Sequence, residues 1–335
     1  MRIAIFGAGA VGCYLGGCLA ASGAQIVFIG RPRLRDEVAA HGLHLTDYTG
    51  AKHTLASVEF ATEPEAIEGC DVVLVCVKSS DTTAAAQAIR PHVAASTVVV
   101  SFQNGVRNAE VLAQELARDV LAGMVGFNVA AQGKGRFHQG TQGDLHVADS
   151  PALARVLPLF KAAGLSLLGH ADMRPILWAK LMLNLNNAVN ALANIPLRAE
   201  LSQRDFRECL ALAQEEMLAL AAEGGLPRLA KLSPLPATWI PRVLRLPNPM
   251  FRAIAGSMLR IDPLARSSMS DDLALGRVPE VDWINGEVVR LAESLGRDAP
   301  VNRALCRLTH DAANAETRPT WQAADLLAAL KNQMR

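Results

Sequence analysis

The sequence lacks three features, each of which would assign it to a different class of protein. It has no excess of charge, with 33 basic against 32 acidic residues among 335, whereas nucleic-acid-binding proteins normally carry a large basic excess. No hydrophobic run reaches membrane-spanning length without glycine or polar interruption. The six cysteines lie in apolar segments without the paired spacing of a metal site. We therefore expect a cytoplasmic protein with reduced cysteines that acts on small molecules and binds no nucleic acid, membrane or metal.

The length and the hydrophobic pattern predict two domains. A chain of 335 residues exceeds the size at which one core usually suffices. Short apolar runs alternate with helical periodicity up to residue 172, and beyond it the strand pattern disappears. We expect an α/β fold with a Rossmann-type, doubly wound sheet at residues 1–172 and an all-helical domain at residues 173–335.

A glycine motif follows the first predicted strand, Ile3 to Phe6. Three glycines spaced in this way would permit a sharp turn, a close approach of backbone N–H groups to a pyrophosphate, and close packing of helix on strand. The helix N-terminus would then bind the anion. A merely structural turn is the alternative, but the flanking strand and helix favour a dinucleotide site. The residues expected to contact the cofactor here are Gly7, Ala8, Gly9, Ala10, Val11 and Gly12.

The end of the second predicted strand, Gln25 to Ile29, indicates which dinucleotide binds. NAD sites usually carry Asp or Glu there for the ribose 2′-hydroxyl, and this chain has Gly30-Arg31-Pro32-Arg33 instead. A guanidinium at Arg31 would pair with a 2′-phosphate. The sequence therefore favours NADP, with two solvated loop arginines as the alternative.

Two further buried strands each end at a polar side chain. The run Asp71 to Val77 stops at Lys78, and the run Thr97 to Ser101 is soon followed by Asn104. Ligands of open α/β sheets bind beyond the carboxyl ends of the strands, so both side chains are expected to face cofactor or substrate. A structural lysine and an ordinary Asn-Gly turn are the alternatives.

The remaining strands of this half are expected at the edge of the sheet. Glycine-rich connections follow residue 120, and the pattern predicts a last parallel strand within Val120 to Val129. It also predicts an antiparallel hairpin formed by Gly135 to Gln139 and Gly143 to Ala148.

The second half begins with a helix that carries a polar stripe. Lys180, Asn184 and Asn187 are separated by four and three residues, so one ammonium and two amides would share one helix face. A polar stripe on an otherwise apolar helix resembles a site for a polar ligand. A solvated helix face is the alternative.

Two other segments of the second half could contact a partner or a ligand. The segment Pro227 to Pro263 is rich in proline and arginine, and it is either a partner or subunit surface or a solvated basic insertion. Further on, Glu280 precedes an apolar helical run. Its carboxylate could interact with the helix N-terminus or could hold a substrate hydroxyl.

Taken together, these residues resemble the ketopantoate reductases (2-dehydropantoate 2-reductases). The resemblance implies an NADP-dependent enzyme with an N-terminal Rossmann domain and a helical C-terminal domain like that of 6-phosphogluconate dehydrogenase. It spans nearly the whole chain and is carried by Gly7-x-Gly9-x-x-Gly12, Arg31, Lys78, Asn104-Gly105, Lys180-Leu181-x-x-Asn184, Ser267-Ser268-Met269 and Glu280-x-Asp282-x-Ile284-Asn285-Gly286.

The resemblance also implies roles for individual residues. Lys180 would be the general acid that protonates the carbonyl oxygen as hydride arrives, and Glu280 would position the substrate's hydroxyl. Asn104 and Asn184 would contact substrate and cofactor through their amides, and Ser268 would contact the substrate carboxylate. Arg31 would bind the 2′-phosphate of the cofactor, and Lys78 would lie near the nicotinamide.

Two departures from the family pattern concern the substrate. The family's second helix asparagine commonly lies eight residues after the lysine, where this chain has Ala188, so Asn187 would have to replace it. The insertion before Ser268 is also longer than in compact members. We therefore expect reduction of 2-dehydropantoate, with another 2-oxo or hydroxy acid as the alternative enzyme reading.

A non-enzymatic function is the remaining alternative. A protein that binds NADP without catalysis, and uses the basic insertion to bind a partner, would carry the same glycine motif. The apolar C-terminal helices permit a homodimer without requiring one.

Overall fold

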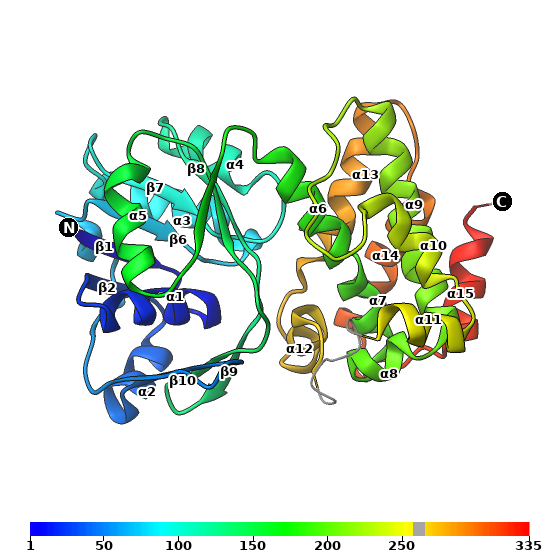
Figure 1. Ribbon diagram of the computed structural model, residues 1–335, viewed down its shortest axis with the longest axis horizontal. Coiled ribbons are helices and arrows are strands. Elements are labelled where there is room, and N and C mark those ends of the chain that lie inside the picture. Colours follow the sequence, from blue (N-terminus) through cyan, green and yellow to red (C-terminus); the bar gives the residue numbers. More distant parts are fainter. Residues whose placement is uncertain (257–264, 335) are drawn as a thin grey trace. The chain divides into compact units, whose positions relative to one another are not determined.

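The computed structural model describes residues 1–256 and 265–334. They form two compact units, Met1–Met173 and Arg174–Arg335 (Figure 1). No helix of the described residues is long and apolar enough to cross a membrane.

The first unit is built on an eight-stranded sheet with the order β12-β11-β8-β7-β6-β1-β2-β5. The six strands from β8 to β5 are parallel, and the chain reverses its direction of winding between β1 and β6. This is the order of a doubly wound Rossmann sheet, so the predicted fold is confirmed. The six strands are β1 (Arg2–Phe6), β2 (Gln25–Ile29), β5 (Glu59–Ala61), β6 (Val72–Val75), β7 (Val98–Ser101) and β8 (Leu121–Val125).

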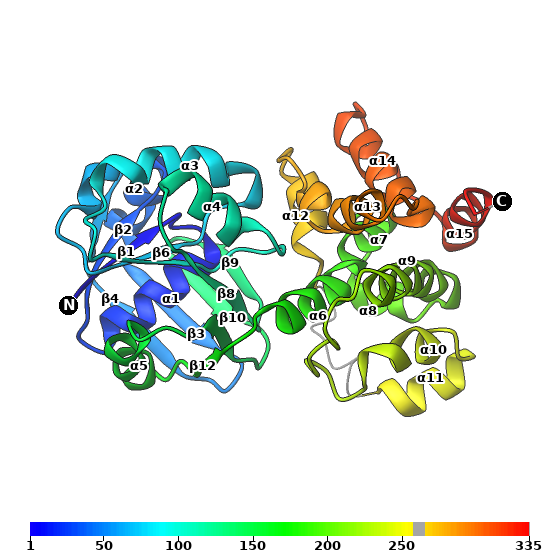
Figure 2. The same cartoon turned by 90° about the horizontal axis from the view of Figure 1, so that it is seen from above.

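Both faces of this sheet are covered by helices, as Figure 2 shows. Alternate residues of β1 point to opposite faces: Ile3 and Ile5 belong to the core that includes α1 (Ala10–Ala21) and α5 (Leu153–Ala162). Ala4 belongs to the core on the other face, which includes α3 (Thr82–Ile89) and α4 (Asn108–Leu116). Burial on both faces explains why the central strands read as continuous apolar runs.

The prediction of a hairpin between Gly135 to Gln139 and Gly143 to Ala148 is wrong. β10 (Arg136–Gln139) pairs antiparallel with β9 (Val129–Gly133) and parallel with β3 (Leu43–Asp47), in a separate sheet of order β4-β3-β10-β9. β11 (Leu145–Ala148) pairs instead with β8 and with β12 (Leu167–His170). The tight turn lies before β10, where residues 133, 134 and 135 all have positive φ. The predicted strand within Val120 to Val129 is β8, but the sequence pattern missed β9 and so assigned the hairpin to the wrong pair.

The regular secondary structure of the second unit is entirely helical in its described residues, as predicted. Its longest helix, α9 (Arg204–Glu223), packs against α7, α10, α13, α14 and α15. The other helices are α6 (Arg174–Asn184), α7 (Asn186–Ala193), α8 (Leu197–Leu201), α10 (Ile240–Leu244), α11 (Asn248–Ala255), α12 (Ser268–Ala274), α13 (Asn285–Ser294), α14 (Pro300–Asn314) and α15 (Ala323–Asn332), with the short 3-10 helices η4 (Ala237–Trp239) and η5 (Glu280–Trp283).

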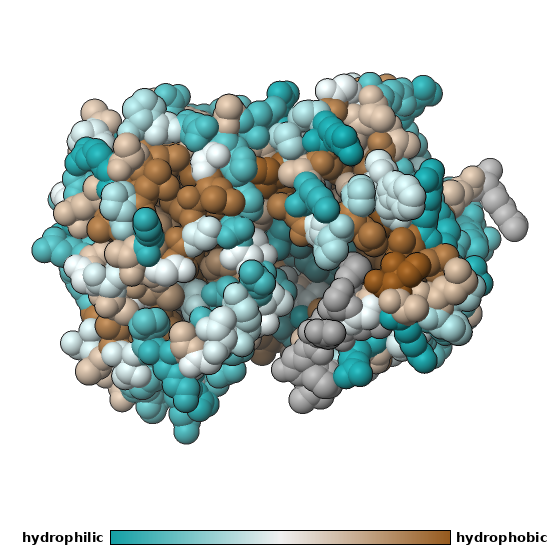
Figure 3. All heavy atoms as spheres, viewed as in Figure 1, coloured by the Kyte–Doolittle hydropathy of each residue, from teal (hydrophilic) through white to brown (hydrophobic). Residues whose placement is uncertain are grey.

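The proline- and arginine-rich insertion folds onto α9, and its last residues, 257–263, lie outside the described residues. A fully buried arginine of α9, Arg207, donates hydrogen bonds to the backbone oxygens of Leu244 (2.9 Å) and Leu246 (2.8 Å). Its guanidinium also lies 4.1 Å from the ring centroid of Phe251 in α11. Figure 3 shows hydrophobic side chains at the surface over this part of the second unit.

Replacing Arg207 is expected to destabilise the second unit. An Arg207→Met variant keeps much of the apolar contact but leaves buried carbonyl oxygens without hydrogen-bond donors. Each buried acceptor left unpaired costs about 1 to 3 kcal/mol of stability. We expect a loss of about 3 kcal/mol of unfolding free energy in urea titrations. Exposed Arg204→Met is the matched control and should change stability by less than about 0.5 kcal/mol. Equal stability of the two variants would contradict this anchoring role.

Candidate functional site

The glycine turn joins β1 to α1 with little room for side chains. Gly7 has φ +99°, and a Cβ added there would lie 2.5 Å from the backbone nitrogen of Val77. A Cβ on Gly12 would lie 2.4 Å from the carbonyl oxygen of Gly7. At Gly9, by contrast, an added Cβ would meet nothing within 4 Å. Two glycines therefore permit close packing, and the third leaves open space beside the helix N-terminus.

The start of α1 is suited to an anion. The helix has no acidic residue in its first turn, so nothing offsets the partial positive charge of its free N–H groups. Arg31 lies at the end of the neighbouring strand β2, as the residue that precedes α2 (Pro32–His41). Its side chain is 84% exposed, and its Nη2 lies 3.7 Å from Oδ2 of Asp81. Such an exposed pair is weak, so the guanidinium can exchange this partner for a ligand phosphate.

The loops that follow β6 and β7 are tied together by a buried network of hydrogen bonds. Oγ of Ser79 donates to the carbonyl oxygen of Asn104 at 2.9 Å, and Nδ2 of Asn108 donates to the same oxygen. Nε2 of Gln103 donates to Oγ1 of Thr82 at 2.8 Å, and that hydroxyl donates to Oδ1 of Asn108 at 3.0 Å. The backbones that carry the partly exposed residues 78 and 104 are therefore fixed relative to one another.

The sheet order places these loops beside the glycine turn. Strands β2, β1, β6 and β7 are consecutive neighbours and run parallel. Their carboxyl ends consequently lie at one edge of the sheet, at the point where the winding reverses. Arg31, the glycine turn, Lys78 and Asn104 are brought to this edge, where doubly wound folds bind ligands.

The sequence reasoning missed the buried support of this edge. Ser79, Thr82, Gln103 and Asn108 each have less than a tenth of their surface exposed. A signal was present, because polar residues directly after a fully apolar strand need buried partners. Their pairing across the two loops could not be read from the sequence, since it depends on β6 and β7 being neighbours.

In the second unit, Lys180 lies in α6 between the buried residues Ala179 and Leu181. Desolvation lowers the pKa of its ammonium from 10.5 to about 8. Part of the residue is exposed, but its ammonium loses hydration that favours the charged form, so the proton becomes easier to release. The side chain is therefore an acid of nearly neutral strength rather than an ordinary surface lysine.

The expected single helix with three polar residues on one face needs correction. Lys180 and Asn184 lie one turn apart in α6, but the helix is interrupted at Leu185, and Asn187 lies in α7. The interruption falls in the run Asn184 to Asn187, whose three amides compete for backbone hydrogen bonds and so weaken a helix. Lys180, Asn184 and Asn187 are each partly exposed, whereas Leu181 and most other neighbouring residues are buried.

Ser268 is the first residue of α12 and the exposed member of its group. Ser267, Met269 and Ser270 are buried, with 5%, 1% and 0% of their surface exposed. Oγ of Ser267 caps the helix by accepting a hydrogen bond from the backbone nitrogen of Ser270 at 3.1 Å. The flanking residues thus hold the segment, and the hydroxyl of Ser268 is accessible to a ligand.

Glu280 lies in η5 with 6% of its surface exposed. The apolar run expected to be one helix is divided, because η5 ends at Trp283 and α13 begins only at Asn285. The residue that precedes α13 is Ile284, which makes no side-chain cap. Glu280 therefore does not cap α13, but it lies in the first turn of η5, where an acid can interact with a helix N-terminus.

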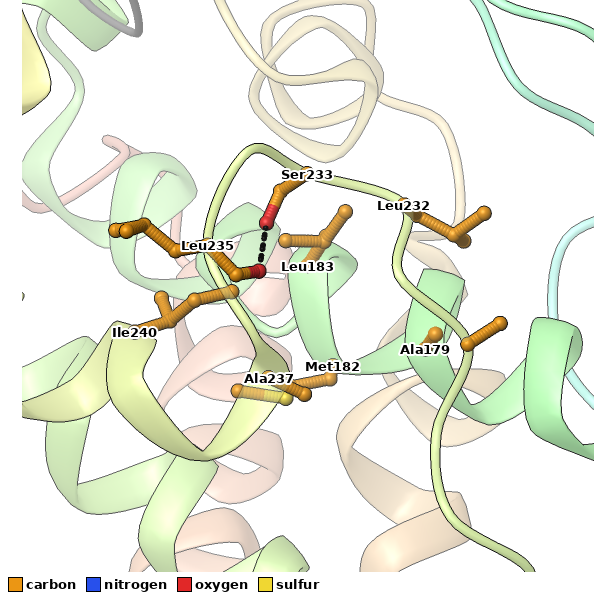
Figure 4. Close-up of a pocket in the computed structure, with 9 residues that line it drawn as sticks. Ala179, Met182, Leu183, Leu232, Ser233, Leu235, Ala237 and Ile240 are labelled. Carbon is orange, nitrogen blue, oxygen red and sulfur yellow. Dashed lines mark hydrogen bonds between the residues drawn. The ribbon is translucent and has the colours of Figure 1, made fainter.

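The described part of the insertion packs against α6. Figure 4 shows a small hollow between Ala179, Met182 and Leu183 of α6 and insertion residues that include Leu232 and Leu235. Its volume is about 10 Å³, enough for about one water molecule and no substrate. The insertion thus supports the helix that carries Lys180, and this hollow is not a binding site. In residues 1–256 and 265–334, no group of three His, Cys, Asp or Glu could hold a metal ion.

Comparison with protein-family models gives two matches along this chain. A model described as "Ketopantoate reductase PanE/ApbA" matches residues 3–152, and one described as "Ketopantoate reductase PanE/ApbA C terminal" matches residues 172–313. Among curated proteins, the 2-dehydropantoate 2-reductase of Halobacterium salinarum is 27% identical over 329 residues, covering 92% of this chain and 97% of the relative.

Solved structures agree with these matches. A PanE/ApbA family ketopantoate reductase from Ralstonia eutropha is 32% identical, with a TM-score of 0.80 and full coverage of both chains. A D-mandelate dehydrogenase, solved with NADH and anilino(oxo)acetate, has a TM-score of 0.77 over 94% of this chain and 100% of that one. At 20% identity, this second likeness shows the fold alone.

Removing the Lys180 ammonium is expected to stabilise the protein. Below pH 8 the lysine is charged in both the folded and unfolded states, so folding carries the full cost of desolvating it. A Lys180→Met variant should therefore gain on the order of 2 kcal/mol of unfolding free energy at pH 7. The gain should shrink as the pH rises from 8 to 10.5, where the lysine is neutral in both states.

Urea titrations at a series of pH values measure this difference. Lys331→Met is the matched control, because that side chain is 53% exposed. A Lys180→Met variant that is no more stable than the wild type at pH 7 would show that the ammonium is not desolvated.

Proposed function

Because the chain belongs to the ketopantoate reductase family, we propose that this oxidoreductase uses NADPH to reduce 2-dehydropantoate to (R)-pantoate. The observation that carries the proposal is the desolvated ammonium of Lys180, with a pKa of about 8, on a helix that also carries Asn184. A low-pKa amine beside amides is the arrangement needed to protonate a carbonyl oxygen. We assign cofactor binding to residues 1–172 and substrate binding and catalysis to residues 173–335.

The residues of the first unit fit a dinucleotide phosphate. Open space beside Gly9, an acid-free N-terminus of α1 and an exposed Arg31 would hold the pyrophosphate and the 2′-phosphate. Bound NADPH would supply the hydride. In this proposal Lys78 and Asn104 orient the nicotinamide end, since Lys78 follows β6, the neighbour of β1, and Asn104 follows β7, the next strand of the sheet.

In the second unit, Lys180 performs the acid step. Addition of hydride to a ketone builds negative charge on the carbonyl oxygen, and a positioned ammonium stabilises that charge electrostatically. Its Nζ then transfers a proton to the oxygen, which yields the alcohol and a neutral amine. A pKa of about 8 keeps the amine mostly charged at pH 7 and still makes it a competent acid.

The other polar residues of this unit position the substrate. The exposed hydroxyl of Ser268 would donate a hydrogen bond to the carboxylate of the substrate. The side-chain carboxylate of Glu280 would accept one from the 4-hydroxyl of 2-dehydropantoate. Asn184 and Asn187 would bind the remaining substrate oxygens. Asn187 is partly exposed, whereas Ala188 is fully buried, which supports Asn187 as the replacement for the family's second asparagine.

The rate of reduction is expected to fall at alkaline pH. Only the charged amine can donate a proton, so kcat/KM for 2-dehydropantoate should decline above an apparent pKa of about 8. Lys180→Ala should lose about 10²- to 10⁴-fold in kcat while still binding NADPH. Steady-state rates from pH 6 to 10 measure the decline. A Lys180→Ala variant with full turnover would end the assignment of this lysine as the acid.

Cofactor choice is expected to depend on Arg31. Arg31→Ala removes a charge-assisted contact worth about 1.5 to 3 kcal/mol, so KM for NADPH should rise about tenfold to a hundredfold. KM for NADH, which lacks the phosphate, should change little. Arg33→Ala is the matched control, because Arg33 is exposed two residues further along. Equal effects of Arg31→Ala on both cofactors would argue against 2′-phosphate recognition.

A substrate panel separates the proposed reaction from its rivals. Oxidation of NADPH with 2-dehydropantoate, and not with other 2-oxo acids, would support the full proposal. Activity with a different 2-oxo acid alone would retain the chemistry of Lys180 and change the substrate. Binding of NADPH without turnover of any 2-oxo acid would favour a non-catalytic NADP sensor.

A further inference from the structure

The second unit contains a fully buried carboxyl group that the proposed reaction does not use. Glu200, in α8, has no exposed surface. Its Oε2 accepts hydrogen bonds from Nδ2 of Asn190 at 2.7 Å and, more weakly, from Nδ2 of Asn186 at 3.4 Å. Within residues 1–256 and 265–334, Oε1 of Glu200 has no hydrogen-bond partner. Burial raises the pKa of this carboxyl to about 8, so the group is a neutral acid at pH 7.

Asn190 links this carboxyl to the segment that carries Ser268. The Asn190 side chain is also fully buried. Its Nδ2 donates to Glu200 and to the carbonyl oxygen of Ile195 at 3.0 Å. Its Oδ1 accepts a hydrogen bond from the backbone nitrogen of Ser267 at 2.9 Å. The amide is thereby held in one orientation by Glu200 while it fixes the backbone immediately before Ser268.

The same segment contacts the polar stretch of α7. Oγ of Ser267 donates to the carbonyl oxygen of Asn187 at 3.2 Å while it accepts from the nitrogen of Ser270. On the other side of the segment, Arg318 donates to the backbone oxygen of Ser270 at 3.0 Å and to its Oγ at 2.9 Å. The exposed Ser268 is thus presented by a buried frame, and its own hydroxyl is not part of that frame.

We propose that Glu200 and Asn190 are positioning residues for substrate recognition: the carboxyl of Glu200 orients Asn190, and Asn190 fixes Ser267 so that the hydroxyl of Ser268 faces the substrate's carboxylate. The inference rests on the proposed function of Ser268. It assigns a role to a pair of residues that touch neither substrate nor cofactor. Their loss acts on substrate affinity, because the acid step at Lys180 does not depend on them.

The neutral state of the acid determines which substitution preserves the frame. An ionised carboxylate without a cationic partner would be strongly disfavoured in this environment. Glutamine has the same shape and keeps an oxygen that can accept from Asn190. Glu200→Gln should therefore retain the function, whereas Glu200→Ala leaves the amide of Asn190 without its main acceptor.

Steady-state kinetics with NADPH and 2-dehydropantoate test the proposal. We expect Glu200→Ala to raise KM for the 2-oxo acid about tenfold, with kcat and KM for NADPH within about twofold of the wild type. Glu200→Gln should stay within about twofold of the wild type in all three constants. Glu216→Ala is the matched control, because Glu216 is a desolvated acid that caps α14 through the nitrogens of Val301 and Asn302.

A double-mutant cycle tests whether Glu200 acts through Ser268. If it does, Glu200→Ala should have little further effect on KM in a Ser268→Ala background. Equal effects in the two backgrounds would overturn the proposal. An equal rise of KM in Glu216→Ala would also overturn it, because the effect would then be general destabilisation.

Hydrogen exchange tests the frame without any use of activity. Peptides that cover residues 265–275 should exchange at least tenfold faster in Glu200→Ala than in Glu200→Gln or Glu216→Ala. Unchanged exchange in Glu200→Ala would refute the anchoring. If the wild type reduced no 2-oxo acid but exchange responded as expected, the anchoring would stand and the proposed substrate role of Ser268 would fail.

Discussion

The close approach of α1 to β1 is the constraint on which the first unit depends. A Cβ on Gly12 would lie 2.4 Å from the carbonyl oxygen of Gly7, and one on Gly7 would collide with the backbone at Val77. This contact sets where α1 begins and brings its N-terminus next to the loop that follows β6. The edge of the sheet that carries the glycine turn, Lys78 and Asn104 is therefore shaped by close backbone packing between β1, α1 and the loop after β6, which glycine makes possible.

The second unit depends on a different principle, the burial of polar groups in a helical core. Lys180, Glu200 and Arg207 are each desolvated, but their surroundings differ. Arg207 retains its charge and supports the insertion by donating to backbone oxygens. Glu200 has amides rather than a cation around it, and burial raises its pKa. For Lys180 burial lowers the pKa. In the proposed reaction, the desolvation cost of the lysine produces a useful acid, as expected where function and stability conflict.

The sequence predicted most of the fold and the parts of the site that depend on local chemistry. The strand β2, the glycine turn and the change to an all-helical unit follow from periodicity and backbone sterics, which act over a few residues. The pairing of β10 was not predicted, because pairing partners are decided by tertiary contacts. The same limit explains why the networks around Asn108 and Asn190 were missed, since each joins segments that are distant along the chain. The interruption at Leu185 was also missed, although three asparagines within four residues were a local signal of a weakened helix.

In the proposed reaction, substrate choice involves the segment around Ser268. The fold is shared with a D-mandelate dehydrogenase at 20% identity, so the framework itself does not select a 2-oxo acid. The hollow beneath α6 is too small for a ligand, and the described insertion supports that helix. In the proposed reaction, selectivity arises from exposed groups whose backbones are held by buried ones. Asn187 and Ser268 are such groups, and Ser267 joins them through a single hydrogen bond. A change in this frame would therefore act first on Ser268, which directly follows Ser267, whereas the backbone of Asn187 is held within α7.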